Sequence, residues 1–151
     1  MTYLLDQNVV KELTSQSPNK HVDAWFNSVD DGEIFLSVMT LMESEKGIEM
    51  ERQKKTGDTS VQERRKKGIK VGEKSLANLR ADFKHRIFDF DDECAIELGR
   101  LVGQKNKSNF DLAYAATAKR HSLILVTRNI SDFTGRGIAL LNPFVSNPTV
   151  I

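Results

Sequence analysis

Residues 110–133, FDLAYAATAKRHSLILVTRNISDF, contain the pattern that decides the fold of this chain. The first part, residues 110–121, is rich in alanine and predicts a helix. Leu123–Thr127 follows as a short apolar run, which predicts a strand buried on both faces. Two acids flank this unit, since Asp111 stands in the first turn of the helix and Asp132 comes after the strand. A helix that leads directly into a buried strand indicates an α/β protein with a parallel sheet.

Helices and strands alternate along the rest of the chain as well. Further strands are predicted at residues 2–6, 34–38, 87–90 and 138–141, and further helices after Asn8, at 20–29, around Met42, at 73–84 and around Leu98. Such alternation predicts right-handed crossovers between parallel strands. We therefore expect an α/β fold of three layers, with a mostly parallel sheet between helices, in a single domain over residues 1–151. A basic insertion, helical or looped, is expected at about residues 51–75.

The composition is that of a globular protein, with 39% hydrophobic and 28% charged residues among 151. One cysteine excludes a disulfide within the chain and a zinc site built from cysteines. The opening MTYLLDQNVVKEL lacks the basic and apolar regions of a signal peptide, and no apolar run approaches the length of a membrane span. We expect a cytoplasmic protein without a membrane partner.

The net charge of +1 conceals an uneven distribution of charge. Residues 52–70 contain eight Lys or Arg against Asp58 and Glu63, a local charge of +6, which leaves the rest of the chain at about −5. A basic segment beside an acidic pocket suits a polyanionic substrate, although a basic segment can equally be a solvated linker between helices. Seven residues are the candidates for RNA contact: Arg52, Lys54, Lys55, Arg64, Arg65, Lys66 and Lys67.

Four carboxylates follow segments predicted to end at one edge of the sheet: Asp6, Glu43, Asp111 and Asp132. Open α/β sheets build their sites at the carboxyl ends of the strands. Carboxylates gathered there repel one another unless a cation neutralises them, and with oxygen ligands alone that cation is Mg²⁺ or Mn²⁺. The four acids therefore predict metal-dependent chemistry on phosphates.

Each acid also has an explanation that needs no metal. Asp6 can cap the helix that follows it, a role open equally to Asn8. Glu45 is a close rival of Glu43, and an acid in the first turn of a helix, such as Asp111, is favoured by the helix dipole alone. Asp132 can be a plain turn residue.

Four segments of the sequence resemble those of PIN-domain proteins of the VapC and FitB type. YLLDQNVVKEL is similar to their opening Y-x-L-D-T-N-V, and TLMESEKG to their TLxEL-x-x-G. Residues 110–133 are similar to the block D-x-x-IAATA…L-x-LVT-x-N-x-x-DF, and the ending G-x-x-LLNPF to GV-x-x-x-NPW. The resemblance spans residues 1–50 and 86–144, and it leaves residues 51–85 uncovered.

The resemblance implies a PIN fold with sheet order 3-2-1-4-5 and an endoribonuclease that depends on Mg²⁺ or Mn²⁺. It implies the toxin of a type II toxin–antitoxin pair, a homodimer, and a small antitoxin that blocks the acidic pocket, often with an Arg. Promoter DNA is then bound only through the antitoxin complex. Asp6 and Asp111 are expected to bind the metal directly, with Glu43 and Asp132 acting through it or through a water. The residues expected to support these acids or to position phosphate are Asn8, Thr127 and Asn129.

Two positions depart from the family pattern. Gln7 replaces the usual Thr, which is expected to change a hydrogen bond behind the metal and so its affinity. Ser44 replaces the usual Leu and is expected to be a packing change only. Two other functions stay open: a PIN-domain module that binds DNA with its partner and cleaves little, and a nuclease that acts on DNA structures.

Overall fold

The computed structural model describes residues 1–105 and 110–151, and within them five parallel strands form a sheet in the order β3-β2-β1-β4-β5. This is the predicted order, and the α/β fold class is confirmed. The strands are short: β1 Tyr3–Leu5, β2 Ile34–Ser37, β3 Ile87–Phe88, β4 Ile124–Val126 and β5 Leu140–Leu141. β3 and β5 have two residues each, fewer than the sequence predicted.

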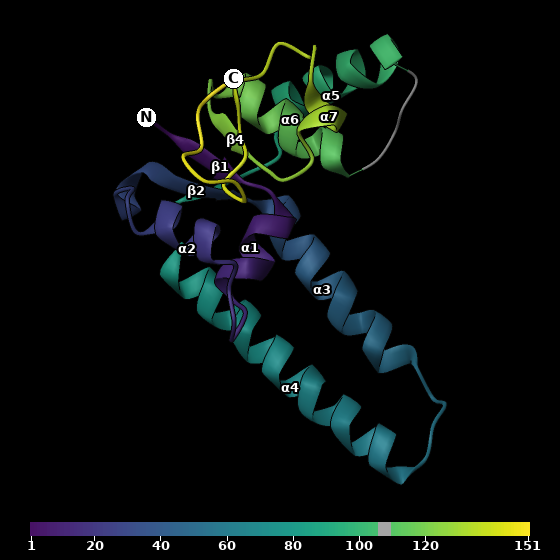
Figure 1. The fold of residues 1–151 in the computed structure, drawn as a ribbon. Helices are drawn as coiled ribbons and strands as arrows, with labels where there is room; N and C mark the ends of the chain where they lie inside the picture. The colour runs from purple at the N-terminus through teal and green to yellow at the C-terminus, as the bar shows by residue number, and fades with distance from the viewer. Residues whose placement is uncertain (106–109) are drawn as a thin grey trace.

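Helices cover both faces of this sheet (Figure 1). They are α1 Gln7–Leu13, α2 Lys20–Phe26, α3 Val38–Gln53, α4 Thr59–Asp82, α5 Asp92–Lys105, α6 Asp111–Arg120 and α7 Ile130–Phe133, with a short 3-10 turn at Asp31–Glu33. One hydrophobic cluster joins the sheet to α1, α2 and the end of α4. A second cluster joins the opposite face to α5 and α6. In the described residues, no helix combines the length and the apolar character that crossing a membrane requires.

The central strand β1 supplies side chains to both clusters. Tyr3 and Leu5 belong to the first cluster and Leu4 to the second, as the alternation of side chains along a strand requires. Leu4 and Leu5 are completely buried. A strand covered on both faces has no solvent-facing side, which explains why its sequence is a continuous apolar run.

Helix α6 is buried along one continuous stretch, Leu112–Ala118. The small alanine side chains allow it to lie close to both the sheet and α5, with which it packs. Tyr114 is the large exception, and it is completely buried. The alanine-rich pattern at residues 110–121 therefore reflects a helix enclosed on most sides.

Helices α3 and α4 form a long hairpin that projects away from the sheet (Figure 1). The sequence predicted a helix at 73–84 and left residues 51–75 as a helical or looped insertion, whereas α4 already begins at Thr59 and α3 continues through Gly47 to Gln53. Two contacts join the two helices. Arg52 bonds Glu73 of the facing helix at 2.9 Å, and at Gly72 a Cβ would lie 3.1 Å from the Ile48 side chain, so glycine permits the close approach.

Candidate functional site

Asp6 lies directly after β1, at the carboxyl edge of the sheet. Its backbone N–H donates to the Val126 carbonyl at 3.0 Å, which extends the pairing of β1 with β4 by one residue. Asp6 occupies the N-cap position of α1, but its side chain forms no capping hydrogen bond. The residue is only 3% exposed. The capping explanation therefore does not account for this buried carboxylate.

The Asp6 carboxylate is held by side chains from two other segments. Its Oδ2 accepts a hydrogen bond from Thr127 Oγ1 at 2.6 Å and one from Asn8 Nδ2 at 2.7 Å. Thr127 Oγ1 also accepts from the Asn129 backbone N–H at 3.0 Å, and Asn8 Oδ1 accepts from the Arg128 backbone N–H at 3.3 Å. Of the three predicted supporting residues, Asn8 and Thr127 thus contact Asp6, while Asn129 acts through its backbone on Thr127.

The negative charges of two further acids act on Asp6. The pKa of Asp6 is raised above its ordinary value, first by burial and then by the negative charges of Asp111 and Glu43, while the hydrogen bond from Thr127 opposes the rise. The charges of Glu43, in α3, and of Asp111, at the start of α6, therefore act on the buried Asp6, although the three acids are far apart in the sequence.

Glu43 reaches the site because α3 starts where β2 ends. Ser37 is the last residue of β2 and caps α3, accepting from the Met39 N–H at 3.1 Å. Within the described residues Glu43 Oε1 is buried and has no hydrogen-bond partner. Its rival Glu45 is exposed and bonds Arg52 at 2.6 Å. Glu43 is therefore the acid of α3 that faces the other carboxylates.

Tyr114 of α6 lies beside Glu43 and was missed by the sequence reasoning. Its hydroxyl is 3.4 Å from Thr40 Oγ1. Burial raises the pKa of Tyr114, and the negative charge of Glu43 raises it further. An alanine-rich helix gives no signal that its one tyrosine contacts an acid of another helix.

Asp132 lies in α7, a helix that the sequence did not predict. Thr127, which donates to Asp6, lies in the β4–α7 connection that precedes Asp132. Arg136 fixes this turn from behind, because its Nε donates to the Asp132 carbonyl at 2.9 Å and its Nη1 to the Leu101 carbonyl at 3.2 Å. Arg136 is 4% exposed and thus joins α7 to α5 inside the protein.

The donor set fits a divalent cation that prefers oxygen. Asp6 is buried beside two other negative charges, and the buried Glu43 Oε1 lacks a partner among the described residues. A cation would relieve both conditions. In the same residues, no group of three or more His, Cys, Asp or Glu side chains is arranged so that it could hold a metal ion.

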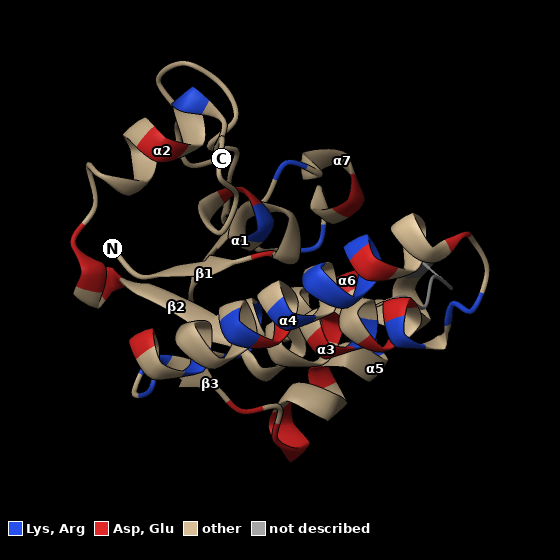
Figure 2. Cartoon of the chain, turned by 90° about the horizontal axis from the view of Figure 1, so that it is seen from below, with Lys and Arg blue, Asp and Glu red and all other residues tan. Residues whose placement is uncertain are grey.

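The predicted basic residues do not surround these acids. They lie mainly toward the far end of the α3–α4 hairpin (Figure 1), and positive and negative residues are interleaved on both helices (Figure 2). Four of the seven have partners within the chain: Arg52 with Glu45, Glu49 and Glu73, Lys54 with Glu51, Arg65 with Glu51 and two carbonyls, and Lys66 with Glu63. No salt bridge engages Lys55, Arg64 or Lys67 in the part of the chain that the structure describes.

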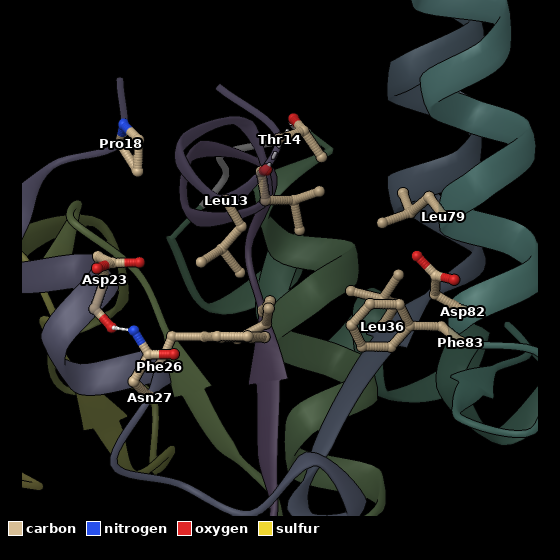
Figure 3. A pocket seen from close by; sticks show the side chains of 12 residues that line it. Leu13, Thr14, Pro18, Asp23, Phe26, Asn27, Leu36, Leu79, Asp82 and Phe83 are labelled. Atoms are coloured by element: carbon tan, nitrogen blue, oxygen red, sulfur yellow. Dashed lines mark hydrogen bonds between the residues drawn. The ribbon is translucent and has the colours of Figure 1, made fainter. Parts of the chain in front are cut away.

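A cavity of about 310 Å³ lies elsewhere, between α1, α2 and α4 (Figure 3). Its lining is mainly apolar, from Leu13, Phe26 and Phe83 among others, with Asp23 and Asp82 beside them. None of the four candidate acids lines it. This cavity is therefore separate from the carboxylate cluster, by which we mean Asp6, Glu43 and Asp111. Its apolar lining and its two acids suit an apolar side chain that has a positively charged group next to it.

The two departures from the family pattern contact each other. Gln7 Nε2 donates to Ser44 Oγ at 3.2 Å, which joins α1 to α3 just beside Asp6 and Glu43. Gln7 is 7% exposed, and its Oε1 is buried without a partner among the described residues. The expectation that Ser44 is a packing change only is wrong, because its hydroxyl satisfies a buried amide.

Replacing Ser44 by alanine is expected to lower the free energy of unfolding by about 1–3 kcal/mol, because Gln7 Nε2 loses its acceptor in a buried place. The double variant Gln7→Leu/Ser44→Ala should recover most of this loss, since both polar partners are then gone. Urea denaturation measures both values. Ser60→Ala, at an exposed serine of α4, is the control, and a Ser44→Ala loss no larger than that of this control would contradict the expectation.

Comparisons with known proteins agree with this architecture. A family model described as "PIN domain" matches residues 3–133, a range that includes residues 51–85. The chain is 28% identical to Toxin FitB of Neisseria gonorrhoeae over 146 residues, covering 93% of this chain and 97% of that protein. It is 27% identical to VapC ribonuclease Y4jK of Sinorhizobium fredii, covering 93% and 96%. The solved structure of FitAB bound to an IR36 DNA fragment is similar with a TM-score of 0.75 at 28% identity, over 97% of this chain and 98% of that one.

Proposed function

The chain belongs to the PIN-domain family, and we propose that it is a metal-dependent endoribonuclease that serves as the toxin of a type II toxin–antitoxin pair. The observation that supports this most directly is that Asp6 is buried and that the negative charges of Asp111 and Glu43 act on it. Two relatives point the same way, since one is named a toxin and another a VapC ribonuclease.

The proposed site would hold Mg²⁺ or Mn²⁺ through Asp6 and Asp111, with Glu43 and Asp132 acting on the ion or on a water. When bound, the ion would lower the pKa of a water molecule and neutralise negative charge on the phosphate oxygens. The rest is done by the chain itself. Thr127 and Asn8 hold one oxygen of Asp6 in place, and the hydrogen bond from Thr127 lowers the pKa of Asp6 against the effect of burial.

The proposed substrate is RNA, bound through its backbone by basic residues of the hairpin. Lys55, Arg64 and Lys67 are the best candidates, because the other predicted residues already have acidic partners. Contacts to phosphate release counterions, so RNA binding is expected to weaken as salt rises. Specificity for a particular RNA would come from the site rather than from these charges.

The proposed protein partners are a small antitoxin and a second copy of this chain. The apolar cavity between α1, α2 and α4 suits an apolar side chain of the antitoxin, and Asp23 and Asp82 suit a basic residue next to it. Promoter DNA would be bound only through the antitoxin complex.

A second candidate function is a module that binds DNA with a partner and cleaves little. The observation that favours it is the similarity to FitAB, which was solved bound to DNA. The two functions differ in what the acids do, because a binding module does not need a metal-dependent carboxylate.

The purified chain, free of antitoxin, should cleave RNA in Mg²⁺ or Mn²⁺ and not in EDTA. Total RNA and single-stranded DNA offered together would separate a ribonuclease from a DNA nuclease. Cleavage of RNA alone would support the proposal. A folded protein that cleaves neither polymer in any metal would favour the binding module instead.

A further inference from the structure

Phe110 is an exposed aromatic side chain beside the carboxylate cluster. Half of its surface, 50%, is accessible to solvent, although burial of such a ring stabilises a fold. Single exposed apolar residues are common and need no explanation by themselves. Phe110 differs from the others in its place, because it directly precedes Asp111 at the start of α6.

A lysine from another helix lies against this ring. Lys46 Nζ is 5.3 Å from the centre of the Phe110 ring. Lys46 follows Glu43 by three residues in α3, and residues at that spacing are neighbours on one side of a helix. The Lys46–Phe110 pair therefore joins α3 to α6 beside an acid from each helix.

The charge of Lys46 is available to a ligand. The guanidinium of Arg52, further along α3, is occupied by three glutamates. No salt bridge engages the ammonium of Lys46 within residues 1–105 and 110–151. A lysine with an aromatic contact and no acid partner can donate to phosphate while the ring offers a surface for stacking.

We propose that the Lys46–Phe110 pair binds one nucleotide of the RNA next to the phosphodiester that is cleaved, with its base stacked on Phe110 and its phosphate contacted by Lys46. This rests on the proposed ribonuclease function and adds two residues that bind the substrate beside the site. Bases stack on aromatic side chains only where they are unpaired, as in loops and single strands. The nucleotide that the pair binds is therefore expected to be unpaired, in a single strand or a loop.

The first experiment measures binding without cleavage. A short single-stranded RNA that contains 2-aminopurine is titrated with the protein in EDTA, and both anisotropy and base fluorescence are followed. Phe110→Ala is expected to weaken binding about tenfold and to abolish the fluorescence change caused by stacking, whereas Phe110→Trp retains both. Lys46→Ala is expected to weaken binding and to reduce its dependence on salt, and Lys46→Arg to restore it.

A matched control separates stacking from a general loss of apolar surface. Ile96 of α5 is 51% exposed, almost the same as Phe110, and Ile96→Ala removes a similar apolar surface from a different helix. Because both side chains are half exposed, the variants should stay folded, and thermal unfolding checks this. If Phe110→Ala binds RNA as well as Ile96→Ala does, the proposal is overturned.

Two other results have distinct meanings. A wild-type protein that binds no RNA, with or without metal, would refute the proposed ribonuclease and this inference with it. Normal RNA binding by Phe110→Ala combined with weaker binding of the antitoxin would refute the nucleotide site alone, because the pair would then be a contact for a protein.

Discussion

Asp6→Asn is expected to reduce metal-dependent RNA cleavage by at least about 10²-fold, the scale of losing one preorganised electrostatic group in a site. Asn keeps the size of the side chain and its ability to accept the hydrogen bonds from Thr127 and Asn8. It lacks the negative charge that a divalent cation requires. Cleavage of a labelled RNA under single-turnover conditions measures the loss, and Mn²⁺ binding by the same variant shows whether it arises from the metal.

The same substitution is expected to raise the melting temperature of the metal-free protein at neutral pH. The pKa of Asp6 is raised in the folded state, first by burial and then by Asp111 and Glu43. Below the pKa of the unfolded chain, Asp6 is protonated in both states and costs nothing. As pH rises above that value, the folded state must pay more than the unfolded chain to ionise Asp6, so the stability of the wild type falls. Asn removes this penalty, and the gain should vanish in acid.

Asp30→Asn is the matched control, since Asp30 is exposed and precedes β2, at the opposite edge of the sheet. It should change neither cleavage nor the pH dependence of melting. Cleavage by Asp6→Asn at the rate of this control would show that Asp6 is not part of the catalytic site. A lower melting temperature for Asp6→Asn in EDTA would contradict the electrostatic account.

Thr127→Val should lower the affinity for Mn²⁺ by about 10–100-fold, as expected for a group that orients a metal ligand. The valine keeps the shape of this completely buried side chain and removes the hydroxyl that donates to Asp6 at 2.6 Å. Without this bond the pKa of Asp6 rises further, since Thr127 lowers it in the wild type. Mn²⁺ must then displace a proton from a larger fraction of Asp6 side chains. The loss of affinity for Mn²⁺ should therefore be larger at lower pH.

Titration of Mn²⁺ by electron paramagnetic resonance measures this affinity without any need for cleavage. Thr127→Ser retains the hydroxyl and should bind the metal nearly as the wild type does. Thr117 offers a matched control, because it is also completely buried and its hydroxyl donates to the Ala113 carbonyl within α6 at 2.9 Å. Thr117→Val should affect stability only. Equal Mn²⁺ affinities for Thr127→Val and Thr117→Val would show that Thr127 does not support metal binding.

Local sequence patterns predicted the parts of the fold in which burial repeats regularly. The apolar runs at β1, β2 and β4 and the alanine-rich α6 were found because their side chains face the core on both sides. The hairpin was underestimated for the opposite reason. Helices α3 and α4 are polar, and what supports them is mutual contact, such as Arg52 to Glu73 and Ile48 over Gly72, which has no local signal.

The sequence by itself predicted the strand order, through resemblance, and it picked out the four acids as candidates. Only the tertiary structure decided which acids act on Asp6. The charges of Asp111 and Glu43 raise its pKa, although both residues are far from it in the sequence. It also decided between Glu43 and Glu45, since the turn of a helix directs one carboxylate inward and the other toward Arg52. The contact between Gln7 and Ser44 is of the same kind. Side-chain pairs between elements depend on packing, and packing is a property of the folded chain.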